Sequence, residues 1–321
     1  MRRAIRLAFA MQRLELRLLL AAVLLVSVAA LAIAWQTRVV RGEQLVCYRN
    51  APAVVEGSEG SPCPAQDGPL QTLDQAAAFA KVGVLAAPIL MGLFLGVPLV
   101  ARELESRTAP LAWSLSRSRR RWLLGRTVPV FGVIVVGCVA AGVAGDVLAH
   151  APPWVEGSDP GFSDWFARGP QVAIRGAAVG AIGLAMGALV GRQLPALLLA
   201  GMATLALFVA TTLVMDRWME SAAEPIVVRP EQIVSGKIYG GALRNDATGQ
   251  LLSDEEAGMA GLWDDPEKLD EFGMPRGFSQ VFFIVPSRRY GEFVVYEAGL
   301  FALVAAAAAG TVVAAVARRR P

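Results

Sequence analysis

The residue types that carry catalytic or metal chemistry are scarce in this chain of 321 residues. Its one histidine, His150, excludes a histidine-based metal cluster and a Ser-His catalytic pair. Of its three cysteines, Cys138 lies in an apolar run, whereas Cys47 and Cys63 share one polar segment. None has the Cys-x-x-Cys spacing of zinc or iron–sulfur sites. The sequence therefore predicts no catalytic site and no metal site.

Four ionisable residues lie inside long apolar runs: Lys81, Asp146, Arg175 and Glu297. Charged groups within membrane spans are candidates for transport chemistry, because placing them in lipid is costly. On the topology derived below, all four fall within about two helical turns of the outer membrane surface. A proton relay requires an acid near the middle of the membrane, and the apolar runs hold none there. Snorkelling of these side chains, or pairing between them, is the preferred interpretation.

The composition is that of a membrane protein. The chain is 55% hydrophobic and 18% charged, which is too little charge to cover a soluble domain of this size. The net charge of +3 reflects arginines that stand in blocks beside apolar runs. Such blocks fix orientation in a membrane, so nucleic acid is not an expected partner.

Six apolar stretches have the roughly 20 residues that a helix needs to cross a bilayer. They are Leu16–Trp35, Phe79–Val100, Val128–Ala149, Val172–Val190, Leu194–Met215 and Phe293–Ala317. Only three residues separate the fourth stretch from the fifth, which forces an antiparallel pair of helices. The predicted fold is an all-α polytopic membrane protein with six transmembrane helices.

Arginines determine the expected orientation, since they accumulate on the cytoplasmic side. They concentrate in residues 1–17, in the segment 101–126 and in the tail 318–320, with Arg192 in the tight turn. All four segments fall on one side if the six helices span, so both termini are expected in the cytoplasm. The first stretch could instead be a cleaved signal peptide, because Ala30-Leu31-Ala32 resembles a cleavage site. Trp35 and the length of the stretch favour a retained span.

The remaining segments are expected to be peripheral. Residues 1–15 mix basic and apolar side chains, which fits an interfacial, elbow-like helix or a frayed basic tail. Residues 36–78, 150–171 and 216–292 are predicted extracellular loops. In the first of them, Cys47 and Cys63 could form a disulfide in an oxidising exterior or remain free thiols. The acidic run of the third loop lacks the spacing of a calcium site and predicts a solvated surface.

The fourth apolar stretch carries glycines three or four residues apart. They are Gly176, Gly180, Gly183, Gly187 and Gly191. This spacing places them along one stripe of a helix, where the absence of side chains lets another helix approach closely. We predict that they serve helix packing.

The segment between the second and third stretches is too charged to enter the bilayer and too patterned for a plain linker. Leu104, Leu111 and Trp122 are among the residues that give short helices here an apolar side. The charged side would then be free to contact a soluble partner. A docking loop and a basic loop that only sets topology remain the two interpretations of these residues.

The order of residue types in this segment carries a family resemblance. The series comprises Glu103, Glu105, Thr108, Leu111-Ala112-Trp113, Ser116, Arg119, Arg121-Trp122-Leu123 and Gly125-Arg126. It resembles the corresponding segment of ABC-2 type transporter permeases, most closely those of high-GC Gram-positive bacteria. Two positions depart from that pattern. Arg107 stands where those proteins usually have glycine before the threonine, and Arg126 replaces a lysine, keeping the charge but not the ammonium chemistry.

The resemblance implies an ABC-2 exporter-like permease fold over residues 16–317, in a bacterial plasma membrane. It implies a second permease copy or a homologous permease, and separate ATP-binding subunits that hold ATP and Mg. No cofactor is expected in this chain, which has no Gly-x-x-x-x-Gly-Lys-Ser/Thr sequence. Residues 101–126 would be the cytoplasmic coupling loop. Its ATPase-coupling residues would be Glu103, Glu105, Thr108, Trp113, Arg119, Arg121 and Arg126.

The predicted function is therefore the permease subunit of an ATP-driven exporter that works by alternating access. A stand-alone secondary transporter or channel is the alternative from another class, although it would more naturally show internal repeats or ionisable residues at the membrane centre. An ABC-type sensing or immunity complex without bulk export is the alternative within the family. The sequence favours no particular substrate.

Overall fold

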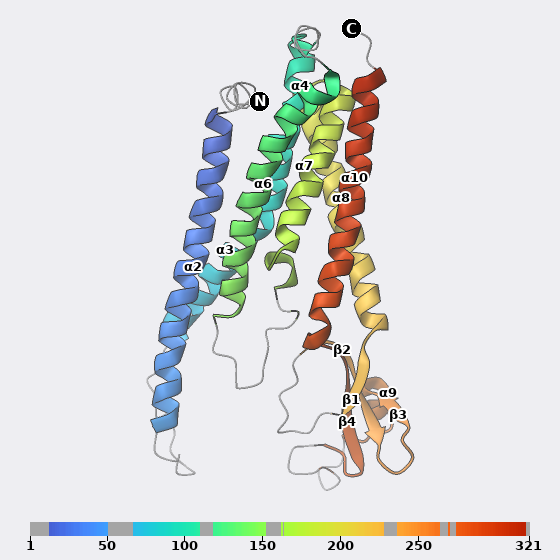
Figure 1. Ribbon diagram of the computed structural model, residues 1–321. Coiled ribbons are helices and arrows are strands. Elements are labelled where there is room, and N and C mark those ends of the chain that lie inside the picture. Colours follow the sequence, from blue (N-terminus) through green and yellow to red (C-terminus); the bar gives the residue numbers. More distant parts are fainter. Residues whose placement is uncertain are drawn as a thin grey trace. The chain divides into compact units, whose positions relative to one another are not determined.

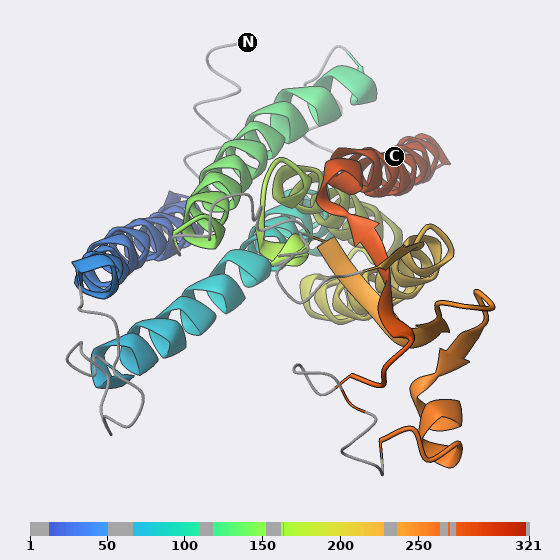
Figure 2. The same ribbon diagram turned by 90° about the horizontal axis from the view of Figure 1, so that it is seen from below.

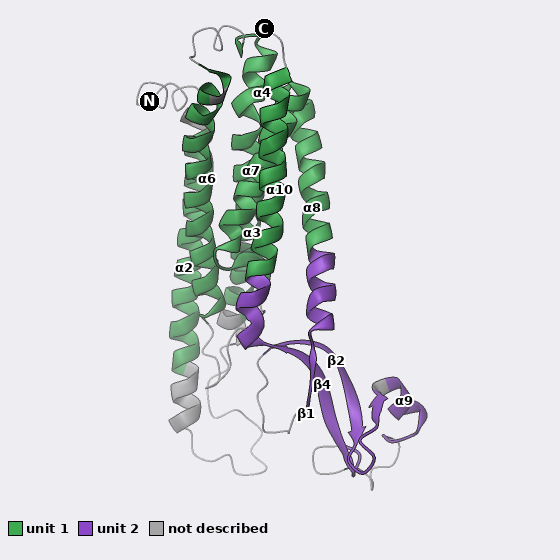
Figure 3. Cartoon of the chain, turned by 45° about the vertical axis from the view of Figure 1, so that its right-hand side comes forward, with its two compact units in different colours: residues 1–153, 164–211, 295–321 green, residues 154–163, 212–294 purple. Residues whose placement is uncertain are grey.

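A computed structural model describes residues 13–50, 67–109, 118–151, 162, 164–227, 236–263, 269 and 274–318. The chain divides into two compact units, coloured separately in Figure 3. Unit 1 comprises residues 1–153, 164–211 and 295–321, and unit 2 comprises residues 154–163 and 212–294. The predicted interfacial helix lies outside the described residues except for its last three positions. So does Cys63, together with the side chain of Cys47, so the predicted disulfide stays a prediction.

Among the residues that the structure describes, six helical segments are long and apolar enough to cross a membrane, which confirms the predicted number of spans (Figure 1). The helices that form them are α2 (Arg13–Asn50), α3 (Asp67–Gly96) with α4 (Pro98–Glu105), α6 (Arg119–Ala149), α7 (Gln171–Val190), α8 (Gln193–Ser221) and α10 (Tyr290–Arg318). The short helix η1 (Trp165–Ala167) precedes α7.

Several helices continue beyond the apolar stretches that predicted them. The helix α2 runs on to Asn50 and α3 begins at Asp67, so both extend into the predicted loop 36–78. Likewise, α4 and α6 take up parts of the segment 101–126. A helix ends where its backbone groups find caps, not where hydropathy changes, and this accounts for the difference.

A proline separates α3 from α4. Pro98 has no N–H to donate to the preceding turn, and it stands at the start of α4, where that loss costs little. In unit 1, α2, α6 and α8 begin and α4 and α10 end at one end of the helices (Figure 1). We call this the α4 end.

The core of unit 1 is built by α2, α3, α6 and α7. The helix α7 packs against both α3 and α6, as seen along the helices in Figure 2. It lies close to α3, where a Cβ added to Gly96 would lie 2.5 Å from the Gly180 carbonyl oxygen. Val84, Leu95 and Ile134 are completely buried in this core.

Unit 2 contains a four-stranded antiparallel sheet, which the all-α expectation did not include. The strands β1 (Glu224–Val227), β2 (Gly236–Asn245), β3 (Leu251–Ser253) and β4 (Phe278–Pro286) pair in the order β1-β4-β2-β3. The strand β4 is rich in β-branched and aromatic residues, which favour pleated structure. The helix α9 (Asp254–Met259) follows β3 directly. The predicted loop 216–292 is therefore a small folded unit.

Within unit 2, the end of α8 is bonded to residues that precede α10. Arg289, in the helix η3 (Ser287–Arg289), donates from Nη1 to the Ala222 carbonyl oxygen at 3.0 Å. Lys237 of β2 forms a hydrogen-bonded ion pair with Asp216 of α8. Burial lowers the pKa of Lys237, but hydrogen bonds to Asp216 and Tyr239 outweigh it, so this pKa is raised overall. Charged contacts thus tie β2 and η3 to the last turns of α8.

Candidate functional site

The segment 101–126, which we call the coupling segment, is described for residues 101–109 and 118–126. Its first part is α4 and the turn after it. The Thr108 N–H donates to the Glu103 carbonyl at 3.0 Å, and the Arg107 N–H donates to the Leu104 carbonyl at 3.2 Å. These two bonds form a Schellman-type helix end. Trp113 lies outside the described residues.

Arg107 has a left-handed backbone conformation in this turn, with φ of 55°. A side chain makes that conformation unfavourable, which is why glycine is preferred at this position of a helix end. The departure noted in the sequence, arginine in place of glycine before the threonine, therefore falls on the one residue of the turn where glycine would relieve strain. The Arg107 side chain is exposed.

Glu103 joins α4 to α6. Its carboxylate forms an ion pair with the Arg126 guanidinium, and Glu103 is only 5% exposed. The guanidinium of Arg126 also lies over the Trp122 ring, 5.1 Å from its centre. A carboxylate at this burial requires a charged partner, so the pair fixes the position of α4 against α6.

Glu105 joins α4 to α8. Its Oε2 accepts the backbone N–H of Gln193, the first residue of α8, at 3.0 Å. A carboxylate at the start of a helix satisfies an N–H group that has no partner within the helix, and it complements the positive end of the helix dipole. The contact therefore holds the start of α8 to the coupling segment.

Arg119 joins α6 to α10. Its Nη1 donates to the carbonyl oxygens of Val316 at 3.2 Å and Ala317 at 3.4 Å. These carbonyls belong to the last turn of α10. Carbonyl groups at the end of a helix have no partner within the helix, and the helix dipole is negative there, so a cation is favourable. Glu103, Glu105 and Arg119 thus join α4 to α6, α4 to α8 and α6 to α10.

The other predicted coupling residues have different roles in the structure. The Arg121 N–H donates to Ser118 Oγ at 3.2 Å, so this position belongs to the N-terminal cap of α6, and its side chain is exposed. Thr108 is exposed, and its hydroxyl lies 2.9 Å from that of Ser106. Arg107, Thr108 and Arg121 therefore present side chains outward, whereas Glu103 is directed into the chain.

A second charged site lies within the membrane-spanning helices, where Arg175 of α7 pairs with Glu297 of α10 (1% exposure for each side chain). Arg175 Nε donates to Glu297 Oε1 at 2.8 Å, and Nη1 donates to the Phe166 carbonyl at 2.6 Å. The guanidinium also lies near the rings of Phe166 and Phe301. The pair connects α10 to α7 and to η1.

The other two intramembrane charges contact residues just before α7. Lys81 pairs with Asp164 at 2.7 Å, and Asp146 pairs with Arg168 at 3.0 Å. The sequence left pairing among the four intramembrane residues as one interpretation, and of these four the structure pairs only Arg175 with Glu297. The sequence did not indicate that Asp164 and Arg168 are the partners of Lys81 and Asp146. Asp164 and Arg168 could have been found from their position shortly before Arg175 in the sequence, because η1 places this segment beside the spanning helices.

The glycines of α7 face two neighbours. A Cβ on Gly176 would lie 2.5 Å from Cys138 Sγ of α6, whereas one on Gly187 would lie 2.6 Å from the Val97 carbonyl oxygen. Gly180 also faces α6 and Gly183 also faces Val97. Gly191 instead ends α7 with a φ of 72°, the left-handed cap that permits the short turn into α8.

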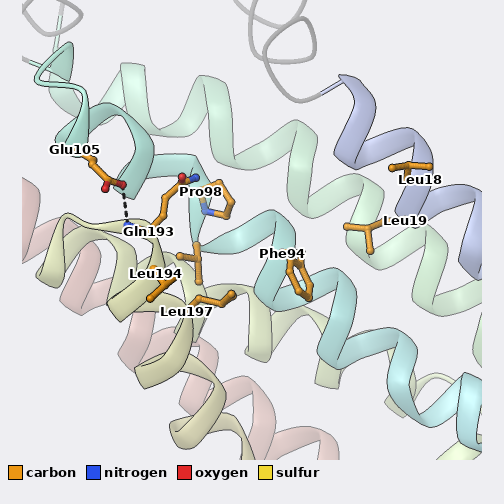
Figure 4. Close-up of a pocket in the computed structure, with 9 residues that line it drawn as sticks. Leu18, Leu19, Phe94, Pro98, Glu105, Gln193, Leu194 and Leu197 are labelled. Carbon is orange, nitrogen blue, oxygen red and sulfur yellow. Dashed lines mark hydrogen bonds between the residues drawn. The ribbon is translucent and has the colours of Figure 1, made fainter.

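A cavity of about 630 Å³ opens at the α4 end of unit 1 (Figure 4). Its lining comes from α2, α3, α4 and α8 and from Val97, which joins α3 to α4. The lining residues are Leu18, Leu19, Phe94, Val97, Pro98, Glu105, Gln193, Leu194 and Leu197. The hydrogen bond between Glu105 and Gln193 lies at its polar side (Figure 4).

The described residues contain no group of three or more His, Cys, Asp or Glu side chains that could hold a metal ion. The structure has the features of a multi-pass membrane transport protein. These are six apolar helices, paired charges within them, and a charged segment that contacts three helices.

Comparison with known families places the chain more narrowly. The model of a family described as ABC-2 membrane transporter related matches residues 19–220, more than half of the chain, which therefore belongs to that family. Membership implies a membrane subunit that associates with an ATP-binding ABC subunit. The match ends before β1, so the sheet and α10 lie outside it. No curated protein and no solved structure matches the chain.

Proposed function

We propose that this protein is the permease subunit of an ATP-driven ABC exporter in a bacterial plasma membrane. Its coupling segment lies in the cytoplasm, and its partners are separate ATP-binding subunits and a second permease. The arginines of residues 13–17, 101–126 and the end of α10 gather at the α4 end, which supports a cytoplasmic location for that end. The ATP and Mg are held by the partner.

The observation that carries this proposal is the set of ion-pair and hydrogen-bond contacts made by the coupling segment. Its buried or bonded charges reach α6, α8 and α10 through Glu103, Glu105 and Arg119. A partner that docks on the exposed side chains of Arg107 and Arg121 would displace α4 and the start of α6. The internal contacts would then pass that displacement to the three helices, which would re-open toward the outside.

The test is co-purification from native membranes in mild detergent, followed by an ATPase assay. An ATP-binding subunit is expected to accompany the chain and to hydrolyse ATP. The variant Arg121→Glu, which changes an exposed side chain, is expected to release that subunit. Arg276→Glu in unit 2 is the matched control, because it makes the same change of charge outside the coupling segment and is expected to retain the subunit.

Arg119→Met separates docking from transmission. It removes the bonds to α10, so the subunit is expected to remain bound while α10 no longer responds to ATP. A fluorescent label on Leu303→Cys, an exposed position of α10, reports that response in a background without the three native cysteines. If the chain purifies without any ATPase partner, the ABC proposal fails and a stand-alone transporter becomes the better assignment.

A further inference from the structure

The cavity at the α4 end has walls of one chemical kind. Seven of its nine lining residues are apolar, and Gln193 and Glu105 are the two polar ones. Leu18 and Leu19 line one side, whereas Phe94, Leu194 and Leu197 lie on the other (Figure 4). Its volume of about 630 Å³ falls in the range of small-molecule sites, which is roughly 300–1,000 Å³. The walls suit the hydrophobic body of a small molecule.

Glu105 is the one charged residue of the lining. Its Oε2 accepts the Gln193 N–H, which leaves the second carboxylate oxygen available to a further donor. A carboxylate beside apolar walls favours a positive group and opposes a negative one. Arg17 and Arg192 precede lining residues in the sequence and are exposed, as Glu105 is, but of these three charged residues only Glu105 lines the cavity.

The position of the cavity also favours a cation. It lies at the α4 end, which is the cytoplasmic end in the proposed function. The cytoplasmic leaflet carries a negative surface potential that concentrates amphipathic cations at its surface. A molecule with an apolar body and a positive group would be enriched where the cavity opens.

We propose that this cavity binds an amphipathic organic monocation, with its apolar body between Phe94 and Leu197 and its charge at Glu105. The proposal names a ligand class for the permease and in that respect rests on the proposed function. It also gives Glu105 two roles. The residue that holds the start of α8 to the coupling segment is the residue that the ligand contacts, so occupancy and helix position are linked at one carboxylate.

Binding is measured by equilibrium dialysis on the purified chain in nanodiscs of neutral lipid, with tetraphenylphosphonium as the probe. Triphenylphosphine oxide serves as the neutral probe with similar aromatic groups. Glu105→Gln removes the charge but keeps a side-chain carbonyl that can accept the Gln193 N–H, so the helix cap is retained. It is expected to weaken binding of the cation about tenfold and to leave the neutral probe unchanged.

Leu197→Trp fills the cavity and is expected to weaken both probes. Glu220→Gln, at an exposed acid in the other end of α8, is the matched control and is expected to change neither. Equal binding of the cation to the wild-type chain, Glu105→Gln and Leu197→Trp would overturn the proposal. So would competition by phosphatidylglycerol that grows stronger in Glu105→Gln, since the cavity would then be a site for anionic lipid.

The chain alone is assayed, without ATP. A loss of the expected binding pattern therefore rejects the ligand class even if an ATP-binding subunit co-purifies. Failure of co-purification rejects the proposed function even if the cation binds at Glu105.

Discussion

The helices α7 and α10 are held in the membrane protein by different means. In the span of α7, 78% of the residues are buried, compared with 17% in the spans of α8 and α10. The position of α7 depends on glycine-mediated contact with α3 and α6, whereas α10 depends heavily on Arg175 and Arg119. The difference separates a helix held by close packing on several sides from an outer helix held mainly by a few charged contacts.

The largest expected effect comes from breaking the buried pair. Arg175→Met leaves the Glu297 carboxylate in an apolar site without its counter-charge, which is expected to lower the free energy of unfolding by about 3–5 kcal/mol. The double variant Arg175→Met with Glu297→Met removes both charges and is expected to recover most of that loss. Thermal unfolding in detergent measures both. A double variant as unstable as the single one would show that the loss does not come from the uncompensated Glu297 carboxylate.

The packed core is tested at the contact between α3 and α7. Gly96→Ala places a Cβ 2.5 Å from the Gly180 carbonyl oxygen and must push α3 from α7, which is expected to cost about 1–3 kcal/mol of stability. Gly201→Ala on α8 is the matched control, because a Cβ there meets nothing within 4 Å. It is expected to gain about 0.5–1 kcal/mol from helix propensity. Equal losses for the two variants would contradict the contrast between core and outer helices.

The turn after α4 tests a part of the coupling segment that backbone bonds hold. Arg107→Gly removes a side chain from a left-handed residue and is expected to stabilise the chain by about 1 kcal/mol. The same variant is expected to weaken retention of the ATP-binding subunit, because the exposed guanidinium is lost. Greater stability with unchanged retention would confine Arg107 to the turn and remove it from the docking surface.

The smallest effect concerns α9. This short helix is held at its start by a capping box between Ser253 and Glu256, in contrast to the close packing of α7 and the charged contacts of α10. The backbone N–H and hydroxyl of Ser253 donate to the Glu256 carboxylate and lower its pKa below the ordinary value of 4.5. The lowered pKa stabilises the folded form above pH 4.5, and this stabilisation is lost as the pH falls through the folded-state pKa. Hydrogen exchange, corrected for its intrinsic pH dependence, is expected to show fraying of α9 as the pH falls below 4.5 and through the lowered pKa of Glu256. In the Glu256→Gln variant, the fraying of α9 is expected to depend less on pH. Identical pH profiles for the wild-type chain and the variant would show that the Glu256 carboxylate does not cause the pH dependence.

The sequence predicts the spanning helices well because each needs only a local run of apolar residues. It does not predict what Glu105 or Arg119 contacts, since those partners lie 88 and 197 residues away and leave no local pattern. The docking role of Arg119 stays a prediction, and the structure adds an internal contact that any variant there will also break. The sheet was missed because even its longest strand, β2 with 10 residues, is too short to give the apolar run of about 20 residues that marks a span, so hydropathy alone marks the region as a loop.

The separation of Arg175 from Glu297 has a consequence for biogenesis. The two residues are 122 positions apart, so synthesis at roughly 5–20 residues per second delays the carboxylate by about 6–24 seconds. During that interval α7 must wait beside the insertion machinery, or draw water or lipid phosphate toward its guanidinium. The delay ends when α10 is synthesised and its Glu297 carboxylate can pair with Arg175. A truncated product without α10 would keep an intramembrane cation without its carboxylate, and we expect it to be degraded faster than the chain that contains α10.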